Sequence, residues 1–160
     1  VKFSQKLKLY QAQIEQRSIH RRVIWSFTKE KIIERPILGH GVFSSRTLGN
    51  KYQLINMHDK KMPAIPLHPH NGLMQIWLEL GLVGVILFYI LILVLINKIY
   101  MISKYNTKYS AFGIVSLCQI LFIGQLSYGF WQSWWISVIL INIFVFRVLY
   151  KTVLNTNKFN

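Results

Sequence analysis

Residues 80–96 read LGLVGVILFYILILVLI, and this uncharged run decides the fold. A helix needs about 20 mostly apolar residues to cross the hydrocarbon core of a bilayer. The residues from Leu73 onward supply the remaining length, so we expect one membrane span over residues 73–97. Gly81 and Gly84 fall early in this span, where glycine favours a kink.

A second uncharged block, from Ser110 to Phe146, is long enough for two short spans. Residues 127–129 form the natural turn between them, and an interfacial aromatic belt is expected just beyond it, at Trp131, Trp134 and Trp135. We therefore expect spans over 111–127 and 131–149; a buried helix pair is the alternative for this block. The composition agrees, because only 15% of residues are charged, against roughly 25% in soluble domains.

Lysine and arginine predict the orientation of these spans. The loop 98–110 and the tail from Arg147 are basic, whereas the tip at 128–133 has neither residue type. Cytoplasmic loops carry the excess of Lys and Arg, so we expect the loop and the tail inside and the tip outside. Residues 1–71 then lie outside too, although they carry most of the 19 Lys and Arg, because long segments translocate largely regardless of charge.

The predicted fold class is all-α: a polytopic membrane protein with three transmembrane helices and an N-terminal external (periplasmic) helical loop. We assign residues 1–71 to this loop, 72–150 to the three-span bundle and 151–160 to a cytoplasmic tail. An external N-terminal segment needs upstream sequence to carry it across the membrane. We therefore expect the chain to be the C-terminal part of a larger multispan protein.

The external loop has internal organisation of its own. A helix is predicted over 11–35 and must end before Pro36, because proline pushes the preceding residue out of the helical region. Residues 39–41 (Gly-His-Gly) follow as a tight loop, and no element is predicted for 44–62. A three-residue period typical of polyproline II joins Pro63, Pro66 and Pro69. Asn71 is well suited to cap the helix that follows.

Two motifs carry a family resemblance. Arg21-x-x-x-Trp25, followed by Glu34-x-Pro36-x-x-Gly39-x-Gly41-x-Phe43, resembles the external-loop signature of the O-antigen ligase and polysaccharide polymerase superfamily. His70-Asn71-x-x-x-Gln75-x-Trp77-x-Glu79-x-Gly81-Leu82-x-Gly84 is similar to the histidine motif of the same family. The resemblance covers about residues 17–90, whereas the later spans agree in hydropathy only.

The resemblance implies a metal-independent glycosyltransferase of the bacterial inner membrane, with its active face periplasmic and no cofactor. Its donor would be a glycan linked to undecaprenyl pyrophosphate, and its acceptor a hydroxyl, usually on lipid A-core. A polysaccharide polymerase, which differs in its acceptor, is one alternative. A non-catalytic membrane protein, such as a transporter part or a truncated remnant, is the other, and the fragment by itself is not required to be active.

The chemistry of such a donor suits two residues. His70 would accept the proton of the acceptor hydroxyl, since a neutral imidazole is a general base near pH 7. Arg21 would neutralise the departing pyrophosphate, because guanidinium stays charged and binds phosphate oxygens in a bidentate fork. The predicted catalytic residues are thus His70 and Arg21.

Four further residues are predicted to bind substrate: Arg22, His68, Asn71 and Glu79. Other roles stay open for each kind of residue. His70 could cap a helix or meet a lipid head group, Arg21 and Arg22 could form a solvated face or contact anionic lipid, and Glu79 could orient a neighbour or snorkel. His68 is predicted as a partner of the base rather than the base.

Two ligand classes are set aside. The paired carboxylates that would hold a divalent metal are missing, and a zinc site of His58, His68 and His70 lacks cysteine and regular ligand spacing. No metal site is therefore predicted. The chain is basic, with a pI of about 10.1, but the charge forms no nucleic-acid-binding module. Membrane lipids and lipid-linked glycans are the expected partners.

Overall fold

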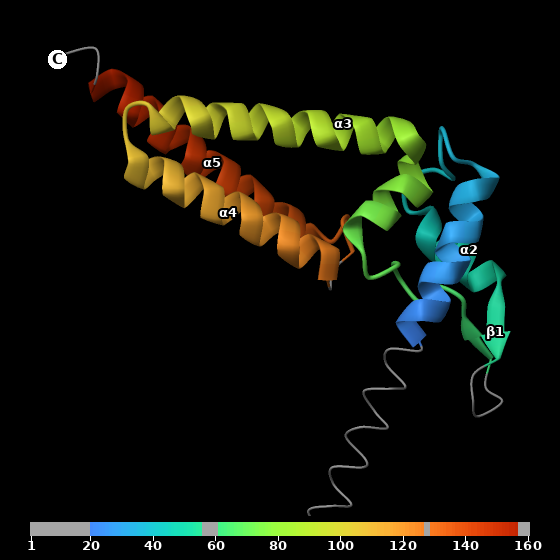
Figure 1. Ribbon diagram of the computed structural model, residues 1–160. Coiled ribbons are helices and arrows are strands. Elements are labelled where there is room, and N and C mark those ends of the chain that lie inside the picture. Colours follow the sequence, from blue (N-terminus) through green and yellow to red (C-terminus); the bar gives the residue numbers. More distant parts are fainter. Residues whose placement is uncertain (1–19, 56–60, 127–128, 157–160) are drawn as a thin grey trace, which may run out of the picture.

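The computed structural model describes residues 20–55, 61–126 and 129–156. Its elements, in order, are a helix over residues 20–34, α2 (Ser44–Lys51), β1 (Gln53–Ile55), β2 (Lys61–Pro63), α3 (Gly72–Ser103), α4 (Thr107–Leu126) and α5 (Ser133–Thr156). Figure 1 shows the three long helices on one side and the remaining elements gathered around the beginning of α3.

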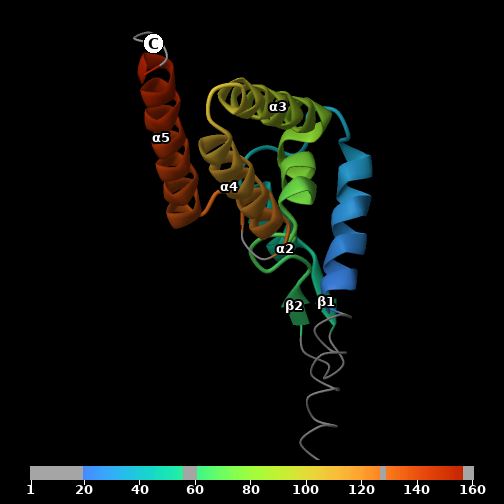
Figure 2. The same cartoon turned by 60° about the vertical axis from the view of Figure 1, so that its left-hand side comes forward.

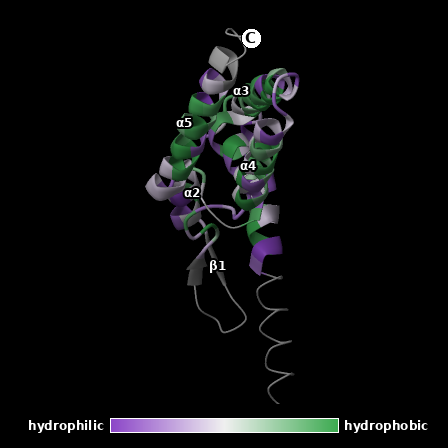
Figure 3. Ribbon diagram, turned by 90° about the vertical axis from the view of Figure 1, so that its left-hand side faces the viewer, coloured by the Kyte–Doolittle hydropathy of each residue, from purple (hydrophilic) through white to green (hydrophobic). Residues whose placement is uncertain are grey.

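The three long helices confirm the predicted spans, since α3, α4 and α5 are each long and apolar enough to cross a membrane. Figure 3 shows hydrophobic colouring on all three. A short connection turns α3 back into α4, and Asn106 caps α4 by accepting a hydrogen bond from the Tyr109 amide at 3.1 Å. The helix α3 extends past its predicted end at residue 97, to Ser103.

A sharp kink divides α3 at Gly81, one of the two glycines at which the sequence predicts a kink, whereas Gly84 is helical. Gly81 has φ 66 and ψ −164, a non-helical conformation that glycine adopts readily. Residues 72–80 form a short helical part and residues 82–103 a long one. In Figure 1 the short part turns sharply away from the line of the long part. The predicted span from residue 73 is therefore not one straight helix.

The 20–34 helix packs on the short part of α3, and Figures 1 and 2 show it lying crosswise to the long part. A small apolar core joins them, formed by Ile24, Ile32, Ile65 and Leu78, with Phe27 and Leu48 beside it. The predicted helix over 11–35 is confirmed over 20–34, and its first residues lie outside the described part of the chain.

The sequence predicts no element for residues 44–62, but the structure contains α2 and a two-stranded antiparallel ribbon there, with Leu54 opposite Met62. Tertiary contacts stabilise α2. Gly49 lies so close to Ile65 that a Cβ atom would come within 1.8 Å of the Ile65 carbonyl oxygen. Pro63 belongs to β2 and residues 64–68 bend, so the polyproline prediction is wrong for this stretch.

Candidate active site at the kink of α3

The turn before α3 holds the two predicted histidines against each other. Asn71 caps the helix, as predicted, by accepting a hydrogen bond from the Met74 amide at 2.9 Å. His70, just before the cap, has φ 55, a left-handed conformation that is uncommon outside glycine and often marks functional sites. The His68 and His70 rings lie 4.4 Å apart between centroids, nearly edge to face.

His68 is the buried member of this pair. Its Nδ1 atom accepts a hydrogen bond from the His70 amide at 3.2 Å, and its ring packs on Gly129, where a Cβ atom would lie 2.8 Å from Cδ2. Burial, aided by the neighbouring charge of His70, lowers the pKa of His68 to about 4. His68 is therefore neutral at pH 7 and supports the backbone of His70.

Trp25 connects the two sequence motifs in space. Its indole Nε1 donates a hydrogen bond to the carbonyl oxygen of Pro69 at 2.9 Å, which anchors the 20–34 helix on the histidine turn. Arg21 lies one helical turn before Trp25 and so on the same side of the helix. Arg21 and Arg22 are exposed. A joint site of Arg21 with His70 stays a prediction.

The segment 36–41 supplies the hydrogen bonds that the kink removes from α3. In an unbroken helix the amides of Leu82 and Val83 would donate to the carbonyls of Leu78 and Glu79. Here they donate to Pro36 and Ile37 instead, at 2.8 and 3.3 Å. The vacated carbonyls accept from His40 and Gly41, both at 2.9 Å. Each broken helical bond is thus replaced by one pair of bonds to the loop.

This exchange requires glycine on both sides. Gly39 has φ +68, and a Cβ atom there would lie 2.5 Å from the Glu79 carbonyl oxygen. Gly81 has φ +66, and its Cβ atom would lie 2.2 Å from the Ile37 carbonyl oxygen. Gly39 of the first motif and Gly81 of the second therefore lie at one backbone contact, where the two motifs meet in space.

Glu79 lies beneath this contact and is fully buried. One carboxyl oxygen accepts from the Ser45 hydroxyl, from the Ser45 amide at 3.4 Å and from Gln75 Nε2 at 3.2 Å. The other accepts from the Phe43 amide at 2.9 Å and from the Trp131 indole. Phe43 and Ser45 belong to the beginning of α2, where the helix dipole favours an acidic group.

The turn between α4 and α5 closes over the same region through Gln75. The Gln75 side-chain oxygen accepts from the Phe130 amide at 2.8 Å, while its nitrogen reaches Glu79. Gln125, at the end of α4, accepts from the Leu73 amide at 3.4 Å. The beginning of α3, the beginning of α2 and residues 129–132 are thereby joined into one polar unit beside the histidine turn.

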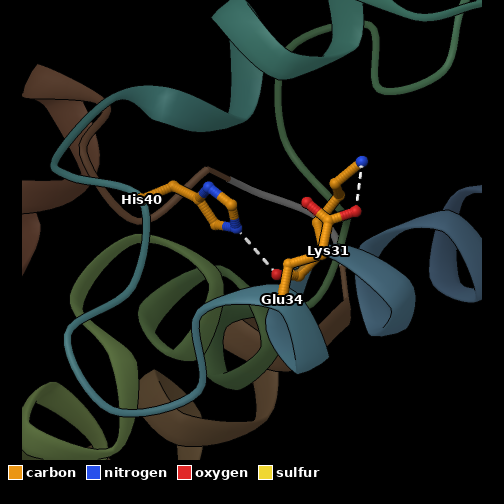
Figure 4. Close-up of polar contacts among 3 residues, drawn as sticks. All are labelled: Lys31, Glu34 and His40. Atoms are coloured by element: carbon orange, nitrogen blue, oxygen red, sulfur yellow. Dashed lines mark hydrogen bonds and ion pairs between the residues drawn. The ribbon is translucent and has the colours of Figure 1, made fainter.

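His40 attaches the segment 36–41 to the 20–34 helix. The His40 Nε2 atom donates to the carbonyl of Lys31 at 2.7 Å, and Figure 4 shows this contact beside the Lys31–Glu34 ion pair of 2.5 Å. The hydrogen bond to Glu34 raises the pKa of Lys31, and the same bond lowers the pKa of Glu34. Lys31 also lies 4.1 Å from the Tyr52 ring centroid. The hydrogen bond to the Lys31 carbonyl gives His40 a structural role.

The structure thus brings some of the predicted site residues together and places the others on a neighbouring helix. His70, His68 and Asn71 form one turn, with Glu79 further along the same helical part. Arg21 and Arg22 lie on the neighbouring 20–34 helix. Sequence reasoning assigned no role to Gln75 or Ser45 and gave Trp131 to the aromatic belt. Among the described residues, no group of three or more His, Cys, Asp or Glu side chains could hold a metal ion.

Three apolar helices carrying a polar unit around a histidine turn define a multi-pass membrane protein with a candidate site at one end of its helices. A sequence profile described as O-Antigen ligase matches residues 4–89, more than half of the chain, and the chain belongs to this family. The resemblance drawn from the two motifs is thereby confirmed.

Similar proteins come from Rickettsia. The one from Rickettsia conorii is 41% identical over 119 residues, covering 74% of this chain and 28% of its own length. The one from Rickettsia felis is 40% identical over 119 residues, covering 74% and 29%. The one from Rickettsia bellii is 35% identical over 133 residues, covering 82% and 32%. All three bear the name "Putative polysaccharide ligase". The chain spans a third or less of the length of these curated relatives, and no solved structure matches it.

Proposed function

We propose that the protein to which this chain belongs transfers a glycan from undecaprenyl pyrophosphate to an acceptor hydroxyl, of the lipid A-core type, at the periplasmic face of the bacterial inner membrane. Family membership supports the ligase class, and the names of the Rickettsia relatives agree with it. The observation that carries the proposal is the Trp25–Pro69 hydrogen bond, which brings the arginine motif onto the histidine turn.

In the proposed reaction, the acceptor oxygen attacks the anomeric carbon of the donor sugar. The bond from that carbon to the pyrophosphate oxygen breaks, and the pyrophosphate leaves with the electron pair. His70 takes the proton of the acceptor hydroxyl, and Arg21 stabilises the charge that develops on the leaving group. The positive charge comes from the guanidinium group, so the step as written uses no metal.

The remaining residues would serve this pair. Arg22 would contribute further positive charge, and His68, being buried and neutral, would hold the backbone of His70 in its left-handed conformation. Asn71 would fix the start of the helix beside the base. The structure directs both oxygens of Glu79 to protein groups, so we favour a positioning role for it over contact with substrate.

The test uses the full-length protein and a labelled lipid-linked glycan. His70→Ala should lower the rate of transfer by about 10²–10⁴-fold, the usual cost of losing a general base, while membrane insertion and donor binding persist. His20→Ala is the matched control, because His20 is exposed on the 20–34 helix, and it should leave the rate unchanged. Retention of most activity by His70→Ala would overturn the assignment. A longer carrier-linked glycan, in place of a glycosylated acceptor, would identify a polymerase.

A further inference from the structure

The loop between the 20–34 helix and α2, residues 36–43, exposes an unusual amount of apolar surface. Its large apolar side chains are each at least half exposed: Ile37 62%, Leu38 77%, Val42 50% and Phe43 65%. Several exposed apolar side chains gathered on one short segment are typical of a contact with a membrane or another protein. We call residues 36–43 the apolar loop.

The position of the apolar loop relative to the membrane span is set by its hydrogen bonds. The Pro36 and Ile37 carbonyls accept from Leu82 and Val83, the first residues of the long part of α3. These two residues lie near the start of the uncharged run 80–96 and are themselves 42% and 45% exposed. Figure 1 shows the loop beside this end of α3. The apolar loop therefore lies at the depth where α3 enters the bilayer.

Much of the backbone of the loop meets the main requirement for contact with lipid. Irregular backbone is tolerated at membrane depth only when its polar groups are bonded within the protein. The amides of Gly39, His40 and Gly41 donate to Arg35, Leu78 and Glu79. Pro36 has no amide hydrogen, and the Phe43 amide is bonded to the Glu79 carboxyl group.

Charge at both ends of the loop fits a phospholipid surface. Arg35 precedes it and Arg46 follows it, and both are exposed. Apolar residues flanked by Lys or Arg are typical of segments that lie in the interface, where the basic groups meet anionic head groups. The Phe43 ring also lies 6.2 Å from that of Trp131, so the apolar surface continues onto an aromatic residue suited to the interface.

We propose that the apolar loop is a second membrane contact, in which Ile37, Leu38, Val42 and Phe43 lie among lipid acyl chains and Arg35 and Arg46 lie at anionic head groups. This contact holds the kink of α3 at the bilayer surface. It is independent of the chemistry proposed for His70, since it rests on exposure, depth and charge alone.

A nitroxide label reports the surroundings of the loop directly. The full-length protein, with its own cysteines replaced, would carry Leu38→Cys and be placed in bilayers of phosphatidylethanolamine and phosphatidylglycerol. The measurement compares collisions of the label with oxygen, which concentrates in lipid, and with a water-soluble nickel chelate. Leu87→Cys on the long part of α3 is the lipid reference, and Asn50→Cys on α2 is the aqueous reference; both sites are exposed.

We expect the oxygen-to-nickel collision ratio at Leu38 to resemble that at Leu87 and to exceed that at Asn50 several-fold. Because Leu38 is 77% exposed, its substitution should not disturb folding. A ratio at Leu38 equal to that at Asn50 would place the loop in water and overturn the proposal. Low collision rates with both reagents would show that other parts of the protein cover the loop, and would overturn it equally.

Discussion

A carboxyl group as deeply buried as that of Glu79 is stabilised only while its hydrogen-bond donors stay in place, and those donors depend on it in turn. Phe43, Ser45, Gln75 and Trp131 all donate to it. A buried donor that loses its acceptor costs about 1–3 kcal/mol. Removal of the Glu79 side chain should therefore cost several kcal/mol, by separating α2 and residues 129–132 from α3.

The prediction is that Glu79→Ala lowers the thermal unfolding midpoint in detergent and speeds amide hydrogen exchange in α2. Glu79→Gln, which keeps one acceptor, should have a smaller effect. Glu30→Ala provides the control, because Glu30 is exposed on the 20–34 helix. Unchanged exchange in α2 after Glu79→Ala would show that Glu79 does not hold the start of that helix.

His68 should make stability depend on pH. Its pKa is lowered from 6.5 to about 4 by burial, so the unfolded chain binds the proton more readily than the folded one. Stability from neutral His68 is therefore present above about pH 6.5 and is lost as the pH falls toward 4. At 1.4 kcal/mol per pKa unit, the loss is on the order of 3 kcal/mol at most.

The measurement is the unfolding midpoint between pH 7 and pH 4, for the natural protein and for His68→Gln. The difference between the two proteins should shrink as the pH falls, because only the natural protein has a buried imidazole to protonate. Parallel curves would contradict the burial of His68.

At the scale of elements, the hydrogen-bond exchange between the apolar loop and α3 requires close packing at two glycines but not at a third. A Cβ atom at Gly39 or Gly81 would collide with backbone atoms, whereas one at Gly41 would meet nothing within 4 Å. Gly41→Ala should therefore cost only the strain of its φ of +98, about 1–3 kcal/mol.

Gly39→Ala and Gly81→Ala should be markedly worse than Gly41→Ala, since the loop must separate from the helix to admit the methyl group. Limited proteolysis of residues 36–43 in membranes should show faster cleavage for these two variants than for Gly41→Ala. Equal cleavage of all three would mean that positive φ, and not the close approach, is what requires glycine.

The elements that the sequence predicted are those set by local pattern. Uncharged runs identified the three spans, Pro36 ended the 20–34 helix, and Gly81 marked the kink. The helix α2 was missed because its own sequence lacks an acidic residue at its beginning. The carboxyl group that accepts hydrogen bonds there belongs to Glu79, more than 30 residues away in the sequence. The hydrogen-bond exchange at Gly81 was missed for the same reason, since no local pattern specifies a partner distant in the sequence.

The candidate site divides in the same manner. The helix-capping role of Asn71 follows from its position before an apolar run, and it was predicted. The burial of Glu79 was not, because its neighbours come from α2 and from the turn after α4. The contact of Trp25 with Pro69 was also missed, although the spacing of Arg21 and Trp25 had singled out that side of the helix.

At the scale of the whole molecule, the orientation of the spans stays a prediction from the distribution of Lys and Arg. Ser133 and Thr107 are exposed at opposite ends of the long helices. A cysteine at Ser133 should react with an impermeant thiol reagent added to intact cells, and a cysteine at Thr107 should react only after the membrane is permeabilised. The reverse labelling would place the histidine turn on the cytoplasmic side and contradict the proposed periplasmic site.

The central claim is that Arg21 and His70 act on the same reacting bond, and the coupling between them tests it most directly. The measurement is the rate of glycan transfer by the full-length protein with Arg21→Lys, with His70→Ala and with both. Residues that act as a unit lose activity non-additively. The double variant should thus be scarcely slower than His70→Ala alone. A double variant slowed by the product of the two single effects would show that the residues act independently, and would contradict their action as one unit on that bond.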